Sequence, residues 1–274
     1  MVQRSGIITF KENEVHCLRM GAGPKLLIAF HGFGNDAGAF GPLAALMQEE
    51  YTIVAVDLPG HGRTQWKDPY LEKSGLMAIV QGIRNDFGAQ KFGLLGYSMG
   101  ARLALTVAEL QPDWIDLLAL LAPDGLEKNF WYNFATRNPA GKILFRKMLH
   151  RPEQWLHWAD RLRRYRVLDE SRFRFVRNHL TNEEVRRRLG YVWPVTSRLQ
   201  VAMPLVKWNL RKQKIPIHVF MGKHDRIFPP AIGKRFVRNL KTARLHLLEA
   251  GHNLLDGKAP AEIATILKSQ QNLC

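Results

Sequence analysis

One short segment constrains this chain more than any other: Gly-Tyr-Ser-Met-Gly at residues 96–100, placed between an apolar run and a helix-forming run. A strand that turns directly into a helix must bend tightly, and glycines two residues before and after Ser98 permit that bend. The serine then lies in strained backbone at a helix start, where the first amides stabilise a developing negative charge. The segment predicts that Ser98 is a nucleophile; the alternative is a tight turn with an incidental serine.

Four further apolar runs, each followed by glycine and polar residues, have the pattern of a parallel sheet. They cover residues 25–31, 51–57, 217–221 and 245–248. Continuous β-branched and apolar character is typical of strands that are covered on both faces. Asp225 and His252 follow the last two runs, so that the chain order is serine, acid, histidine.

With these segments in place, the chain resembles the α/β-hydrolase superfamily over about residues 14–268. The matching motifs are HGFG at 31–34, DLPGHG at 57–62, GYSMG at 96–100, GKHD at 222–225 and GH at 251–252. One position departs from the commonest pattern, because Ala101 stands where a second glycine usually follows; this is a small-for-small change. The resemblance implies an α/β fold with a mostly parallel central sheet flanked by helices.

The resemblance also implies roles for individual residues. Ser98 would be the nucleophile, His252 the general base and Asp225 the acid that orients the histidine. The backbone amides of Phe33 and Met99 would form the oxyanion hole.

Asp124 competes with Asp225 for the role of the acid. It follows the sixth expected strand, 116–122, and could approach the histidine from there. The superfamily most often places the acid after the seventh strand, which favours Asp225.

Arg102 and His31 are the candidates for substrate binding. Arg102 lies four residues after Ser98, and its alternative is a solvent-facing position on the helix. The alternative for His31 is a hydrogen bond within its own glycine-rich loop. We expect Asp57 to hold the turn that follows its own strand.

The pattern of elements divides the chain into a core and an insertion. Strands and helices alternate over residues 1–125 and 215–274, which we expect to form the α/β-hydrolase core. Between them, residues 126–214 become aromatic, arginine-rich and helical in period, and the resemblance implies a helical cap inserted after the sixth strand. Thr181 to Glu184 are expected to form a capping box there. The other expected strands are 7–10, 14–20 and 91–95, and the expected helices include 74–88 and 98–110.

Positive charge is concentrated in the expected cap. Residues 126–214 contain 21 Lys and Arg against 7 Asp and Glu, a net of +14 out of +16 for the chain, and five of the seven tryptophans. Such a segment could bind an anionic substrate or an anionic membrane surface. Alternatively, the aromatics pack the cap onto the core and the arginines form a solvated face. Nucleic acid is disfavoured because no recognised binding motif accompanies the charge.

The expected reaction is hydrolysis of a carboxylic ester or thioester through an acyl-Ser98 intermediate. Two enzymatic alternatives stay open: a carbon–carbon bond hydrolase, and a lyase similar to the pyruvate-eliminating enzyme of the menaquinone pathway, to which Arg102 would be suited. Dehalogenases and epoxide hydrolases use a carboxylate where this chain has Ser98. A non-enzymatic binding member of the fold is the remaining alternative, and an intact set of three groups argues against it.

Cysteine spacing and the lengths of apolar runs limit the cofactors and the cellular location that we expect for this protein. The two cysteines, Cys17 and Cys274, have no metal-site spacing, and no metal or other cofactor is expected. No run reaches the roughly 18 apolar residues of a membrane span, and the first residues lack the apolar core of a signal peptide. We therefore expect a cytoplasmic protein that acts on a small ester or thioester. The sequence contains no signal for an oligomeric state.

Overall fold

The computed structural model describes residues 3–165, 177 and 180–269, and the chain divides into two compact units. The first consists of Met1–Glu127 with Leu199–Cys274, and the second is Lys128–Arg198. Cys274 lies outside the described residues, as do several arginines of the expected cap. Within the described part of the chain, no helix is both long and apolar enough to cross a membrane.

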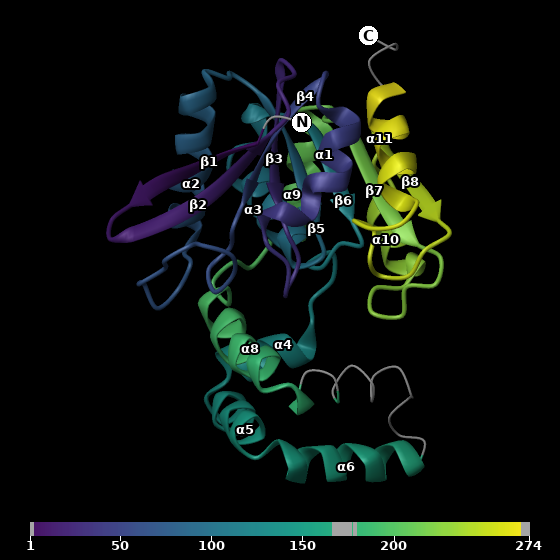
Figure 1. Ribbon diagram of the computed structural model, residues 1–274. Coiled ribbons are helices and arrows are strands. Elements are labelled where there is room, and N and C mark those ends of the chain that lie inside the picture. Colours follow the sequence, from purple (N-terminus) through teal and green to yellow (C-terminus); the bar gives the residue numbers. More distant parts are fainter. Residues whose placement is uncertain (1–2, 166–176, 178–179, 270–274) are drawn as a thin grey trace. The chain divides into compact units, whose positions relative to one another are not determined.

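An eight-stranded sheet runs through the first unit in the order β1-β2-β4-β3-β5-β6-β7-β8 (Figure 1). Each neighbouring pair from β4 to β8 is parallel, whereas β2 runs antiparallel to both β1 and β4. This sheet confirms the α/β fold expected from the sequence. The strands are β1 Gln3–Phe10, β2 Asn13–Met20, β3 Lys25–Phe30, β4 Tyr51–Val56, β5 Phe92–Tyr97, β6 Ile115–Leu121, β7 Ile217–Gly222 and β8 Ala243–Leu248.

The strands differ in burial in the way that their sequences predict. β4, β5 and β7 are buried along their whole length, because helices cover both faces of the parallel part of the sheet. β1 is exposed or half-buried throughout, since it pairs with β2 alone at the edge of the sheet. It starts four residues earlier than expected, and the hairpin register that pairs Gln3 with Met20 explains its length.

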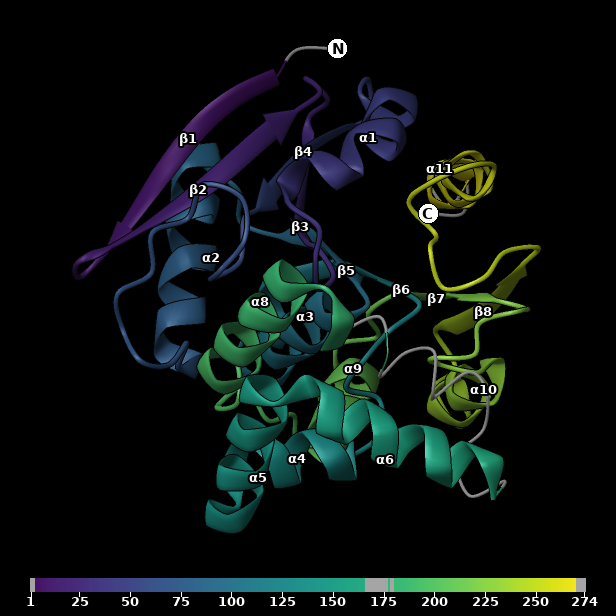
Figure 2. The ribbon, with the colours of Figure 1, turned by 60° about the horizontal axis from the view of Figure 1, so that its bottom comes forward.

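Helices flank the sheet on both faces (Figure 2). α1 and α11 pack against each other on one face, while α2, α3, α9 and α10 lie on the other. Between the sheet and the first pair, a core cluster includes Phe40, Met47 and Ile263, all fully buried. The helices of this unit are η1 Ala37–Phe40, α1 Gly41–Met47, α2 Lys73–Phe87, α3 Met99–Leu110, η2 Pro112–Trp114, α9 Met203–Lys212, α10 Pro230–Val237 and α11 Ala259–Ser269.

Helix α9 groups with the sheet unit, although its residues fall within the segment 126–214 that the sequence assigned to the cap. It packs against α3, and the Asn209 side chain donates to the carbonyls of Ala108 (3.1 Å) and Glu109 (2.8 Å) at the end of that helix. These bonds satisfy carbonyls that a helix end leaves without a partner inside the helix. The second unit therefore ends at Arg198 rather than at residue 214.

The second unit is helical in every element that the structure describes between 128 and 198. Asparagines cap three of its helices: Asn129, Asn138 and Asn182 each accept the amide three residues further on. The expected capping box is wrong in its first residue, because Asn182 is the cap and Thr181 donates to the carbonyl of Arg177 instead. The helices are α4 Phe130–Arg137, α5 Pro139–His150, α6 Pro152–Arg164 and α8 Glu183–Val195.

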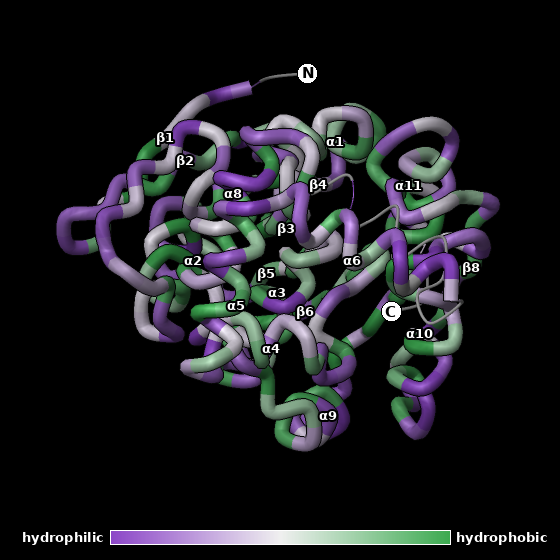
Figure 3. The backbone as a smooth tube through the Cα atoms, turned by 90° about the horizontal axis from the view of Figure 1, so that it is seen from below, coloured by the Kyte–Doolittle hydropathy of each residue, from purple (hydrophilic) through white to green (hydrophobic). Residues whose placement is uncertain are grey.

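The aromatic residues of the second unit fall into two groups. Trp193 stacks on Phe145 with ring centroids 5.4 Å apart, and the Tyr132 hydroxyl lies 3.1 Å from that of Thr196, so these side chains form a small core. Trp131 and Trp158 are instead 71% and 57% exposed. This packing is within the second unit, so the alternative in which the aromatics pack the cap onto the core stays a prediction. Figure 3 shows hydrophilic residues along α8, and the sequence of this helix includes the arginine run 186–188.

Candidate active site

Ser98 lies at the junction of β5 and α3, where the backbone is strained. Its φ is +49° and its ψ is −117°, a conformation that costs a residue with a side chain about 1–3 kcal/mol. Surrounding hydrogen bonds hold it there: the Ser98 amide donates to the Leu121 carbonyl (2.9 Å), and the Ser98 carbonyl accepts from the amides of Ala101 and Asp124 (both 3.0 Å). The strand-to-helix turn predicted from the motif is present.

The two glycines of the motif are required for close approach rather than for conformational freedom. A Cβ on Gly96 would lie 2.5 Å from the Ala101 Cα, and a Cβ on Gly100 would lie 2.0 Å from the Phe30 carbonyl oxygen. Real Cβ atoms do not approach that closely. The positive φ is at Ser98 itself. The sequence predicted that the glycines allow an unusual backbone bend, whereas in the structure they leave room for neighbouring backbone atoms.

The loops that follow β7 and β8 lie directly against each other and carry Asp225 and His252. A Cβ on Gly222 would lie 1.9 Å from the Gly251 carbonyl oxygen, which shows how closely the two loops pack. The Lys223 amide also donates to Leu248 (2.9 Å). Because β7 and β8 are parallel neighbours, residues beyond their carboxyl ends meet at one edge of the sheet.

These segments bring Ser98, His252 and Asp225 into one chain of hydrogen bonds. The Ser98 Oγ lies 2.9 Å from His252 Nε2, and His252 Nδ1 lies 2.8 Å from Asp225 Oδ2. With Nδ1–H donating to the carboxylate, Nε2 of a neutral ring is an acceptor, and the serine hydroxyl donates to it. This arrangement can remove a proton from the hydroxyl.

Asp225 is 4% exposed, and its carboxylate accepts hydrogen bonds from two backbone amides in addition to the one from His252. Its Oδ1 accepts the amides of Ile227 (2.8 Å) and Phe228 (3.0 Å), which stabilise the ionised carboxylate and fix its orientation. The sequence predicted a role for Asp225 but not the hydrogen bonds from these two amides.

Two aromatic rings flank His252, and the sequence motifs assigned a role to neither. The Tyr97 centroid lies 5.7 Å and the Phe228 centroid 5.6 Å from the imidazole centroid. Burial, and secondarily the charge of Asp225, raise the pKa of Tyr97 to about 12, so its hydroxyl stays neutral. Tyr97 is the second residue of the GYSMG motif, and that position was the available signal.

The carboxylate of Asp124 has a partner other than His252. It forms a buried ion pair with Arg102, whose guanidinium Nη2 donates to Asp124 Oδ2. The hydrogen bonds therefore favour Asp225 over Asp124 as the acid that orients His252. The solvent-facing alternative for Arg102 is wrong as well, since the residue is 8% exposed. An arginine neutralised by a neighbouring carboxylate is a weak candidate for binding a substrate anion.

The HGFG loop passes directly beside Ser98. A Cβ on Gly32 would lie 3.1 Å from the Ser98 Cβ, so the next residue, Phe33, follows in the immediate vicinity. Met99 is the first residue of α3, and the first amides of a helix have no partner within it. That the amides of Phe33 and Met99 form the oxyanion hole stays a prediction.

Two histidines support this loop from within. His31 is fully buried; its Nδ1 donates to the Gly32 carbonyl (2.8 Å), and its Nε2 accepts the Leu58 amide (3.1 Å). His61 Nε2 accepts the amide of Gly34 (3.1 Å), a role that the sequence analysis did not assign. His31 makes the expected bond within its loop. Its burial is not compatible with substrate binding by its side chain.

In the described part of the chain, no group of three or more His, Cys, Asp or Glu side chains could hold a metal ion. The polar side chains of Ser98, His252 and Asp225 are hydrogen-bonded to one another.

Comparisons with known proteins show the family of the chain. A family model described as serine aminopeptidase, S33, matches residues 23–256. The uncharacterized hydrolase YugF of Bacillus subtilis is 24% identical over 242 residues, which are 84% of each chain. A pimeloyl-[acyl-carrier protein] methyl ester esterase of Neisseria meningitidis is 26% identical over 240 residues, 82% of this chain and 84% of the esterase.

A third relative and one solved structure extend the comparison. The 2-hydroxy-6-oxononadienedioate/2-hydroxy-6-oxononatrienedioate hydrolase of Comamonas testosteroni is 26% identical over 270 residues, 92% of this chain and 88% of that protein. The enol-lactonase of Burkholderia xenovorans LB400 superposes with a TM-score of 0.66 at 17% identity, covering 96% of this chain and 98% of the lactonase, and it shows a common fold. The chain belongs to the serine aminopeptidase S33 family, and with it to the hydrolases of the α/β-hydrolase superfamily.

Proposed function

We propose that this protein is a serine hydrolase that cleaves a carboxylic ester or thioester through an acyl-Ser98 intermediate. The observation that carries the proposal is the unbroken hydrogen-bond chain from Ser98 through His252 to Asp225, in which the half-buried serine lies on the strained turn between β5 and α3. A binding protein of the same fold would have no need of this set of groups.

In the proposed mechanism, the Ser98 hydroxyl attacks the carbonyl carbon while His252 Nε2 takes its proton. Asp225 holds the imidazole in the required tautomer and stabilises the imidazolium that forms. The tetrahedral oxyanion is stabilised by the amides of Phe33 and Met99, each worth roughly 2.7–4 kcal/mol in such sites. His252 then protonates the leaving alcohol or thiol, and water hydrolyses the acyl-serine with the same base.

The relatives widen the panel of substrates worth testing. One carries the name of a methyl ester esterase, and this supports an ester as the first choice. The relative from Comamonas testosteroni carries the name of a 2-hydroxy-6-oxononadienedioate hydrolase, which keeps carbon–carbon cleavage as the second candidate. The lyase alternative loses its main support, because Arg102 is paired with Asp124.

The test combines labelling with turnover. A fluorophosphonate probe should modify the peptide that contains Ser98 in a fast phase, and Ser98→Ala should remove that phase together with about 10⁶-fold of kcat on p-nitrophenyl esters. Ser74→Ala, at an exposed position on α2, is the matched control. Acyl-CoA thioesters and 2-hydroxy-6-oxo-dienoates complete the panel. A folded protein whose Ser98 does not react would refute the proposal.

We further propose that the positive charge of the second unit favours an anionic substrate or an anionic membrane surface. Its exposed tryptophans and arginines have the composition of surfaces that bind such partners. Turnover of a carboxylated ester should then fall as ionic strength rises, whereas turnover of a neutral ester of equal length should not. Added anionic vesicles distinguish the membrane: they should capture the protein in a flotation assay at low salt.

A further inference from the structure

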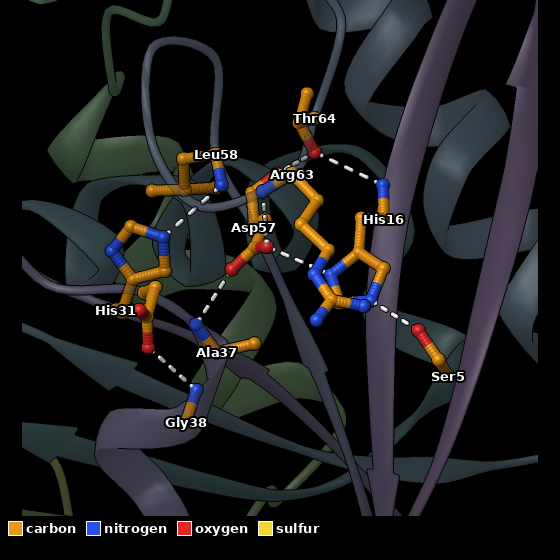
Figure 4. Close-up of polar contacts among 10 residues, drawn as sticks. Ser5, His16, His31, Ala37, Gly38, Asp57, Leu58, Arg63 and Thr64 are labelled. Atoms are coloured by element: carbon orange, nitrogen blue, oxygen red, sulfur yellow. Dashed lines mark hydrogen bonds and ion pairs between the residues drawn. The ribbon is translucent and has the colours of Figure 1, made fainter.

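A second Ser-His-Asp hydrogen-bond chain lies in the sheet unit, formed by Ser5, His16 and Asp57 (Figure 4). The Ser5 Oγ lies 2.5 Å from His16 Nε2, and His16 Nδ1 lies 2.7 Å from Asp57 Oδ2. The atoms and their order are those of the Ser98 site. No member of this chain is shared with that site.

The carboxylate of this second chain is as firmly held as that of the first. Asp57 Oδ1 accepts the Ala37 amide (2.6 Å), and Oδ2 also accepts the Arg63 amide (2.8 Å), so both carboxyl oxygens serve as acceptors. Asp57 holds the turn after β4, as expected from the sequence, and in addition orients His16. With Nδ1–H directed to Asp57, Nε2 accepts the proton of the Ser5 hydroxyl.

The hydroxyl is accessible, and a cavity adjoins it. Ser5 is exposed on the edge strand β1, whereas His16 is 8% and Asp57 2% exposed. A cavity of about 550 Å³ is lined by Ser5 and His16 together with Gly6, Ile7, Glu14 and Arg63, among others. One acid and one arginine leave this lining without strong net charge, which suits a small uncharged acyl group.

We propose that Ser5 is a second nucleophile, which small activated carboxylic esters acylate. The Ser5 Oγ forms a bond to the carbonyl carbon, the bond from that carbon to the leaving alcohol breaks, and the Ser5 proton passes to His16 Nε2 and then to the leaving group. The product is acyl-Ser5 and one free alcohol. No helix begins at Ser5, which lies within β1, so this site lacks the helix amides that stabilise the oxyanion at Ser98.

The proposal does not depend on the function proposed for Ser98, and it is tested in the full-length Ser98→Ala variant. This variant is treated with p-nitrophenyl acetate, and acetylation is followed by peptide mapping, which separates Ser5 from the α-amino group. Ser5 should be acetylated about 100-fold or more faster than Ser74, an exposed serine on α2 in the same protein, because general-base assistance contributes at least that much.

Two controls link the reactivity to the hydrogen-bond chain. His16→Gln in the Ser98→Ala background should lower the Ser5 rate to that of Ser74, and unfolding the Ser98→Ala protein in urea should do the same. If Ser5 in the folded protein reacts no faster than Ser74, the proposal is wrong. It is equally wrong if folded His16→Gln protein reacts as fast as its parent. Should that variant unfold, the comparison of Ser5 with Ser74 in folded and urea-treated Ser98→Ala protein decides.

Discussion

The Ser98 and Ser5 sites contain the same three residue types, joined in the same order, on two different backbones. Ser98 lies at a strand-to-helix turn with φ at +49°, beside the first amide of α3. Ser5 lies in the middle of an extended edge strand. The comparison separates two requirements of the proposed chemistry: a hydrogen-bond relay that can take the proton of a hydroxyl, which both sites contain, and helix amides that can stabilise the charge that develops afterwards, which of the two only the Ser98 site has beside it.

Among the substitutions that probe this comparison, the largest expected effect concerns Asp225, the proposed orienting acid of the Ser98 site. Asp225→Asn should lower kcat for ester hydrolysis by about 10⁴-fold, because the amide favours the wrong imidazole tautomer, while the substitution keeps the size of the side chain. Steady-state kinetics, with far-UV circular dichroism to show that the fold is intact, provide the measurement. A loss below about 10-fold would mean that His252 does not depend on Asp225.

Removing one member of the Arg102–Asp124 ion pair should lower the free energy of unfolding and leave kcat nearly unchanged. Asp124→Asn leaves the buried guanidinium of Arg102 without its charge partner, and urea denaturation should show a loss of about 3–5 kcal/mol. The kcat of the folded protein should stay within about 10-fold of the parent. The double substitution Arg102→Met with Asp124→Leu should recover most of the stability. If Asp124→Asn instead abolishes kcat in a stable protein, the assignment of the acid has to be reversed.

The backbone of the Ser98 turn can be tested separately from its relay. Gly100→Ala places a Cβ 2.0 Å from the Phe30 carbonyl oxygen, so β3 and α3 must move apart, at a cost of about 3 kcal/mol in the free energy of unfolding. Gly41→Ala is the matched control, because a Cβ there meets no atom within 4 Å. Equal stabilities of the two variants would show that the contact at Gly100 does not constrain the turn.

The smallest expected effect is on the pH dependence of stability, and it concerns His246, whose pKa shift has no carboxylate among its causes. Burial, then the neighbouring His218 and Arg244, lower the pKa of His246 to about 4 from its ordinary 6.5. Between these values the unfolded chain binds more protons, so the contribution of His246 to stability is present above pH 6.5 and is lost as the pH falls toward 4.

His246→Phe removes this titration and keeps a ring against Phe220, whose centroid lies 4.8 Å away. Between pH 7 and pH 4.5 the parent should lose about 1–2 kcal/mol more of its unfolding free energy than the variant, a range reduced because the imidazole is partly exposed. Urea titrations at the two pH values measure the difference. Parallel losses in the two proteins would assign the acid sensitivity to other groups.

Most of the sheet could be predicted from the sequence because each parallel strand is a continuous apolar run followed by a glycine-rich turn. Ser98, Asp225 and His252 were found for the same reason, since each follows such a run. The roles of Arg102 and Asp124 could not be predicted, because their pairing joins a helix to a loop 22 residues away and leaves no local pattern. The contacts of Tyr97 and Phe228 with His252 could not be predicted for the same reason.

The sequence by itself determined the order of strands and turns, and with it where the chemically active side chains stand in the chain. Only the tertiary structure decided which of them meet. His16 and Ser5 come together through hairpin register, and Asp57 joins them because β4 pairs with β2. Local patterns follow from the neighbours of a residue along the chain, whereas a hydrogen-bond partner depends on how distant segments pack, which no local pattern records.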